Sequence, residues 1–254
     1  MKTFKKISFL TIGLAALLLA SNGCKNKEDE TPEIKKGDIH MHFKYTVNGQ
    51  DLQIGQVYEI NGTAVSFEFA NFYLGKIVFH PEQGSHISLG DQYLLVTPDR
   101  HEHSTTQLDA GHYHKVEFII GVDDKENDQT ETDFTNRSPD DPLAMQNPSM
   151  HWGWNGGYKY IRIDGMTDTD ADGTPDTPLG YHLGNFDMFD FIQNYSFDLH
   201  HEIVEGKNVI EFEFDLAKLF TGIDLSTQTD THVFNDVELA KIFHANLGNA
   251  ITLL

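Results

Sequence analysis

Strict alternation of apolar and polar side chains is the feature of this sequence that most constrains its fold. In DIHMHFKYTV, residues 38–47, the apolar Ile39, Met41 and Phe43 are separated by polar neighbours. Successive side chains of a β-strand point to opposite faces, so this period of two predicts a strand with one buried face. The Asn-Gly pair at 48–49 then predicts a turn.

The same pattern recurs along the chain and indicates a β protein. Residues 63–80 place Val65, Phe67 and Phe69 on one face of a strand, ahead of a second apolar run. Gly, Asn and Asp are common in the turns between strands, as their conformational preferences require. Shorter strands are predicted at 93–97, 111–122, 158–164, 195–200 and 208–214.

Helical periodicity is confined to the C-terminal part of the chain. Residues 215–220 predict one or two helical turns with Asp215 as the N-cap. Residues 235–248 predict a longer helix, capped by Asn235 or Asp236 and ended by Gly248. Many short strands with few helices predict a mainly β domain. We expect an antiparallel β-sandwich, Ig-like or jelly-roll-like, with one or two short helices near the C-terminus.

The N-terminus has the pattern of an export signal. Lysines precede an apolar segment at 9–20, which predicts a signal peptide over residues 1–23. The single cysteine, Cys24, follows directly, and we expect it to be lipidated; the alternative is an ordinary secretory signal with an incidental cysteine. The charged residues 24–36 predict a flexible tether, which leaves 37–254 as the folded domain.

The balance of charge restricts the partners of this protein. The formal net charge is -21 at pH 7, and the chain has 14 histidines. Nucleic-acid binding requires clustered Lys and Arg, so this charge excludes it, whereas cations are favoured as ligands. Imidazole is a common ligand of zinc and copper. The sequence lacks the motifs of serine hydrolases, zinc proteases, phosphate loops and dinucleotide sites, so we expect no enzymatic activity.

One acidic loop is similar to part of a calcium-binding loop. Asp168, Asp170, Asp172 and Asp176 stand at positions 1, 3, 5 and 9, with glycine at position 6. The bidentate glutamate expected at position 12 is replaced by Leu179. Calcium could brace this loop, or the loop could be a solvated acidic turn, since Asp and Gly favour turns in any case.

Both tryptophans of the chain lie in one short stretch, MHWGWNGGYKYIRIDG at 150–165. Trp152 and Trp154 could anchor a long loop on the core, which is a frequent use of this residue. They could instead stack on the sugar rings of a glycan. A third alternative is a metal or redox environment, with Met150 and His151 as neighbours.

Several segments together resemble a known family. The chain is similar to the MbnP family, the copper-binding proteins associated with methanobactin operons, which also occur as lipoproteins of Bacteroidetes. The resemblance extends over roughly residues 36 to 250. The segments that carry it are NGQDLQIGQVYEINGTAVSFEFANFYLGKIVF, IIGVDDKEN, MHWGWNGGYKYIRIDG, YHLG at 181–184 and DLAKLF, in that order.

The resemblance implies an exported β-sandwich that binds copper, often with a dihaem peroxidase-like partner protein. It also implies that a tryptophan, Trp152 or Trp154 here, can be oxidised to kynurenine at the copper site. His182, in YHLG, matches a family histidine, and the resemblance implies a further histidine in the first strand. His40 or His42 would supply that ligand, although the usual family position falls on Tyr45. His232, just before the last helix, is another candidate.

These patterns together lead to a functional hypothesis. We expect a cell-envelope lipoprotein of the outer membrane, periplasm-facing or surface-exposed, that binds copper for acquisition or handling without catalysis. His182 and a first-strand histidine should then converge near a tryptophan. The alternative is a calcium-braced surface module that binds a glycan or a protein partner, and a purely structural outer-membrane component is a third possibility.

Overall fold

The first alternating stretch forms the strand β1 (Lys36–Val47) in the computed structural model, which describes residues 34–153, 156–185 and 190–254. Ile39, Met41 and Phe43 are fully buried on one face of β1. His40 and His42 lie half-buried on its other face. The alternation therefore predicts correctly which face of this strand enters the core. Cys24 and the predicted signal and tether lie outside the described residues, apart from the last residues of the tether.

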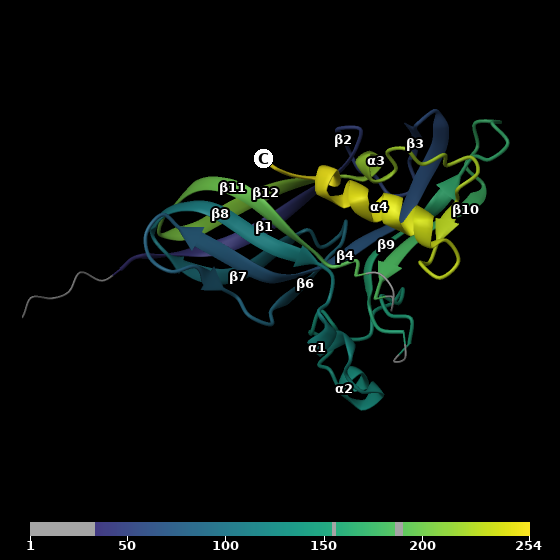
Figure 1. Cartoon of the computed structure of the whole chain (residues 1–254). Helices are drawn as coiled ribbons and strands as arrows, with labels where there is room; N and C mark the ends of the chain where they lie inside the picture. The colour runs from purple at the N-terminus through teal and green to yellow at the C-terminus, as the bar shows by residue number, and fades with distance from the viewer. Residues whose placement is uncertain (1–33, 154–155, 186–189) are drawn as a thin grey trace, which may run out of the picture. The chain divides into compact units, whose positions relative to one another are not determined.

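Two sheets account for the strands in the described ranges (Figure 1). The smaller one contains, in order, β14 (Ile251–Leu253), β12 (Gly206–Asp215), β1 and β2 (Gln50–Asp51), with β7 (Glu102–Asp109) also paired to β1. The larger one contains, in order, β11 (Gln193–Ile203), β8 (Gly111–Ile120), β4 (Thr63–Pro81), β9 (Lys159–Thr167), β10 (Thr177–Gly184) and β13 (Asp230–Thr231). Three short strands pair with β4: β3 (Val57–Ile60), β5 (Ile87–Ser88) and β6 (Tyr93–Val96).

Aromatic side chains join the two sheets through one core. Phe43 of β1 stacks on Phe212 of β12, with ring centroids 5.1 Å apart. It also meets Phe72 of β4 edge to face at 5.4 Å, which brings the smaller sheet against the larger one. All three side chains are fully buried, and burying a phenylalanine stabilises a fold by roughly 1.5–3 kcal/mol. The mainly β prediction is confirmed.

The prediction of purely antiparallel sheets is wrong. β1 pairs with β12 in parallel, and so does β10 with β13. Both sheets are therefore mixed. A period of two reports which side chains share a face but carries no information on the direction of the partner strand. Parallel neighbours need a long connection, and β1 and β12 have most of the domain between them.

A bulge in β4 changes the face on which one predicted core residue lies. Phe67 pairs with Gly165 and Phe69 with Asp164, so Glu68 is an extra residue on the β4 side. An extra residue reverses the orientation of the side chains that follow. Phe67 is fully buried as predicted, whereas Phe69 turns to the outer face and is half-buried. The prediction that Phe69 shares the face of Phe67 is therefore wrong.

Two of the four helices in the described part of the chain match the predicted positions. α3 (Leu216–Leu219) is capped by Asp215, whose side chain accepts a hydrogen bond from the Ala217 amide. α4 (Val237–Ala250) is capped by Asp236 but continues past Gly248, because Leu247 and Ala250 are buried against the core. The prediction that Gly248 ends this helix is wrong.

The other two helices lie in the connection between β8 and β9, away from the C-terminus (Figure 1). α1 (Asp124–Asn127) and α2 (Glu131–Thr135) are short and begin at acceptor side chains of Asp123 and Thr130. Such caps satisfy backbone amides that have no partner within the helix. None of the helices in the described ranges is long and apolar enough to cross a membrane.

The stability of this fold should depend on pH through His103, which is 4% exposed. Burial, with the nearby charge of Arg100, lowers its pKa to about 4, from an ordinary value near 6.5. The unfolded chain therefore binds the proton more tightly, and stability should fall as pH decreases from about 6.5 to 4. Urea unfolding at several pH values should show that the wild type loses roughly 2–3 kcal/mol more than His103→Gln over this range. Identical pH profiles for both proteins would contradict this assignment.

Candidate metal centre

The outer face of β10 presents a group of residues around His182. Tyr181 and Leu183 point into the core, so Gly180, His182 and Gly184 lie on the opposite face of the strand. His182 is 7% exposed, which is unusual for a titratable residue on that face. The two glycines leave space on either side of its ring, and residues from other segments fill this space.

Asp164 of β9 orients the ring of His182. Its Oδ1 lies 2.5 Å from His182 Nε2, and its Oδ2 accepts a hydrogen bond from Arg162 Nε at 2.5 Å. Burial lowers the pKa of His182, and the Asp164 carboxylate offsets this only in part. For Asp164, burial alone would raise the pKa, but His182 and Arg162 outweigh it and lower the pKa. His182 is therefore neutral at pH 7, donating from Nε2 and keeping a lone pair on Nδ1.

His232 stacks against His182, although the two are far apart in the sequence. Their ring centroids are 4.4 Å apart and the planes are tilted by only 10°. His232 directly follows β13, which pairs with β10 in parallel and so brings it to Gly180. A Cβ atom on Gly180 would lie 3.4 Å from His232 Nε2, so the ring lies directly over this glycine. Unlike His182, the His232 side chain is exposed.

Trp152 lies over Gly184, on the other side of His182. A Cβ atom on Gly184 would come within 2.1 Å of Trp152 Cζ3, so the indole occupies the place of the missing side chain. The half-buried Trp152 ring also contacts Phe234 edge to face, with centroids 5.6 Å apart. The tryptophan stretch and the YHLG element are therefore two parts of one packing unit. Trp154 lies outside the described residues.

Two cations hold the start of the tryptophan loop beside this group. Arg162 Nη1 and Lys159 Nζ both donate hydrogen bonds to the Ser149 carbonyl oxygen, at 2.7 and 3.1 Å. Lys159 Nζ lies 6.0 Å from the centroid of the Trp152 ring, and the Arg162 guanidinium lies 4.8 Å from the Phe69 ring centroid. Burial and the charge of Arg162 lower the pKa of Lys159.

The first-strand histidines do not join His182. His40 Nδ1 lies 3.0 Å from Glu102 Oε1, and His42 Nδ1 lies 3.2 Å from Glu211 Oε1. Both histidines lie on the outer face of the smaller sheet, whereas His182 lies on the outer face of the larger one. The shared core separates these two faces. Of the copper candidates within the described ranges, the structure therefore brings together His182, His232 and Trp152.

Sequence reasoning did not identify Asp164, Arg162 and Phe234 as part of this group. The alternation in YKYIRID carried a signal for two of them, since Arg162 and Asp164 are two apart and share one face of a strand. The position of Phe234 carried no such signal, because it follows from the pairing of β13 with β10.

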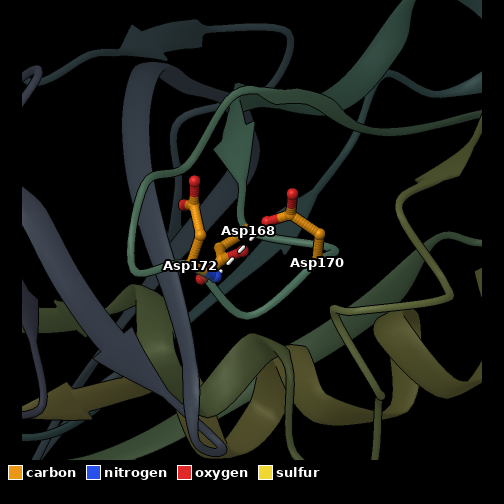
Figure 2. A group of neighbouring side chains, drawn as sticks. All are labelled: Asp168, Asp170 and Asp172. Carbon is orange, nitrogen blue, oxygen red and sulfur yellow. Dashed lines mark hydrogen bonds between the residues drawn. The ribbon is translucent and has the colours of Figure 1, made fainter.

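The acidic loop brings together three of its four predicted ligands. Asp168, Asp170 and Asp172 each offer a carboxylate oxygen within 4.8 Å of the others, and Figure 2 shows all three on one loop. Asp168 Oδ1 and Oδ2 accept hydrogen bonds from the amides of Ala171 and Gly173, at 2.8 and 2.7 Å. Asp176 is not part of this group. The loop thus resembles a calcium loop in shape but is also stabilised by its own hydrogen bonds.

The chain is similar to known proteins at the level of family and of fold. The family model described as MbnP matches residues 36–236. Among solved structures, the chain is similar to MbnP from Methylosinus trichosporium, with a TM-score of 0.57 and 16% sequence identity. The match covers 79% of this chain and 83% of that one, and at this identity it shows the fold alone. No curated protein sequence matches the chain.

Proposed function

This chain belongs to the MbnP family, and on that premise we propose that it binds copper through His182 and His232, beside Trp152, without catalysing a reaction. The observation that carries the proposal is the meeting of these three side chains from separate segments on one face of β10. The role would be acquisition or handling of the metal.

The immediate surroundings of His182 are those of a metal-binding histidine. Such residues typically donate one ring N–H to a carboxylate, which fixes the tautomer and points the other nitrogen at the metal. The contact between His182 Nε2 and Asp164 has this form. The stacked ring of His232 would have to turn to place a nitrogen next to His182 Nδ1. Since His232 is exposed, this rotation meets little resistance.

The charges near His182 and His232 favour a monovalent ion over a divalent one. Asp164 contributes one negative charge, while Arg162 and Lys159 contribute two positive charges. A cation of low charge is repelled less by this arrangement than a divalent ion. Cu(I) also accepts soft or imidazole ligands readily. We therefore propose Cu(I) as the bound form.

Trp152 would complete the site after oxidation. Oxidative cleavage of the indole C2–C3 bond, with C2 then lost by hydrolysis as formate, would give kynurenine. A carbonyl and an aromatic amine would then replace the donor-only N–H, and both can bind a metal or a hydrogen-bond partner. Phe234, 60% exposed and in contact with Trp152, offers an apolar surface beside it. A dihaem peroxidase-like partner, as the family resemblance implies, would dock there and supply the oxidising equivalents.

We propose that the protein works in the cell envelope, attached to the outer membrane through a lipid on Cys24 and either periplasm-facing or surface-exposed. The apolar segment at 9–20 and the cysteine that follows support this location. The charged residues between Cys24 and β1 would hold the domain away from the lipid surface.

The alternative function is a calcium-braced module that binds a glycan or a protein. The acidic loop supports its calcium part. The glycan part needs a flat, exposed indole, whereas the Trp152 ring is half-buried between Gly184 and Phe234. Copper binding is therefore the function that the geometry supports better.

Anaerobic titration of the full-length chain with Cu(I), in competition with a chromophoric chelator, tests the proposal. We expect one tight site per chain that a large excess of Ca²⁺ does not weaken. Intact mass spectrometry of protein from the native source should show the mass change of tryptophan oxidation. The absence of tight Cu(I) binding, together with calcium-dependent thermal stabilisation, would instead favour the alternative.

A further inference from the structure

A second group of histidines lies at the other end of β4. His80 is at the end of β4 and His86 follows it, His112 and His114 belong to β8, and His200 belongs to β11. The His80 ring centroid lies 5.8 Å from that of His86 and 6.0 Å from that of His114. Those of His112 and His200 are 6.1 Å apart. The rings of His80, His86 and His114 thus form one group, and those of His112 and His200 form a pair on β8 and β11.

The spacing of these rings suits shared coordination. With metal–nitrogen bonds of about 2.0–2.1 Å, two imidazoles on one ion have ring centroids roughly 5–6.5 Å apart. The His80–His86 and His80–His114 pairs both fall within this range. Their planes are tilted by 39° and 54°, so neither pair is stacked. Their ligand atoms do not lie within 4.8 Å of one another as those of the acidic loop do, so a metal ion would have to draw the side chains together by rotation.

His80 is held in the way that metal-binding histidines commonly are. Its Nε2 lies 2.6 Å from Glu117 Oε2. A carboxylate on one ring nitrogen fixes the orientation of the imidazole and directs the other nitrogen outward. Lys115 also donates a hydrogen bond to Glu117, at 3.1 Å, which keeps this carboxylate in place.

His114 carries a polar atom that a ligand would satisfy. Its Nδ1 is shielded from solvent and makes no hydrogen bond within the described part of the chain. Glu82 Oε2 is 3.9 Å from this nitrogen and 3.5 Å from His112 Nδ1, so one carboxylate lies between two imidazoles. A shielded nitrogen without a partner is costly unless something binds it. Glu82 and His112 also line a surface pocket of about 610 Å³.

We propose that His80, His114 and Glu82 form a second metal site, which binds a divalent transition ion such as Zn²⁺. Imidazole and carboxylate are the ligands that such an ion prefers, and Glu82 and Glu117 outweigh the single charge of Lys115. The site is independent of the copper proposal. Phe69, which pairs with Asp164, and His80 are separated along β4 by roughly 35 Å at the usual rise of a strand.

Calorimetric titration of the full-length chain with Zn²⁺ tests this site. We expect one tight site in the wild type that weakens at least about tenfold in His114→Gln and in His80→Gln. His40→Gln is the matched control, because it also removes a half-buried strand histidine beside a glutamate. It should bind Zn²⁺ as the wild type does. Cu(I) binding should be the same in all four proteins.

Glu82→Gln gives a readout that does not depend on core packing, because the Glu82 side chain is 64% exposed. It should also weaken Zn²⁺ binding while leaving the unfolding temperature of the metal-free protein unchanged. Wild-type Zn²⁺ affinity in His114→Gln would overturn the proposal. An equal loss in His40→Gln would overturn it too, because it would show unspecific binding to surface histidines.

Discussion

Replacing His182 by glutamine is expected to remove tight Cu(I) binding, with an affinity loss of more than about 100-fold. Glutamine can still donate a hydrogen bond to Asp164 from its side-chain amide, so this buried carboxylate keeps a partner. The imidazole lone pair, however, is lost. The variant should therefore fold with an unfolding temperature close to that of the wild type. Competition with a chromophoric chelator measures the affinity, and thermal unfolding of the metal-free protein controls for the fold.

Two further variants test the second proposed ligand and provide a negative control. His232→Gln should also weaken Cu(I) binding, because the exposed ring is the second proposed ligand. His42→Gln should not, because His42 lies on the outer face of the other sheet, beside Glu211. If His42→Gln lost copper while His182→Gln retained it, the metal centre would have to be placed on the smaller sheet.

Replacing Gly184 by alanine is expected to displace Trp152 and to destabilise the fold by about 3 kcal/mol, at the upper end of the usual cost of overpacking. The added Cβ atom would come within 2.1 Å of Trp152 Cζ3 and 2.4 Å of the Tyr158 carbonyl oxygen. The Tyr158 carbonyl oxygen belongs to the backbone and cannot move away freely. The clash can therefore be relieved only by shifting the backbone. Urea unfolding measures the loss, and a shift in tryptophan fluorescence reports the displacement.

Gly180→Ala is the matched control for this change. It lies four residues earlier on the same face of β10, but its Cβ atom would meet His232 Nε2 at 3.4 Å, an ordinary contact. Its free energy of unfolding should stay within about 1 kcal/mol of the wild-type value. Equal losses in the free energy of unfolding would show that β10 needs glycine at both positions for a general reason. The packing of Trp152 on Gly184 would then not be the cause.

Part of the site could be predicted because it depends on short-range pattern. His182 belongs to a four-residue element, and the alternation of side chains in β10 follows from its sequence. The tryptophan stretch was also recognisable as a unit. The contact between Gly184 and Trp152 was not, since neither residue carries information about the position of the other in the fold.

Local sequence is enough to predict which residues of β1 face the core and where α3 begins, because alternation and capping are local effects. Which histidines meet depends instead on contacts between distant segments. Strand pairing places His232 on His182 and leaves His40 and His42 on the outer face of the other sheet. The bulge at Glu68 likewise turned Phe69 outward. These outcomes depend on pairing between distant segments, and a period of two is compatible with many such pairings.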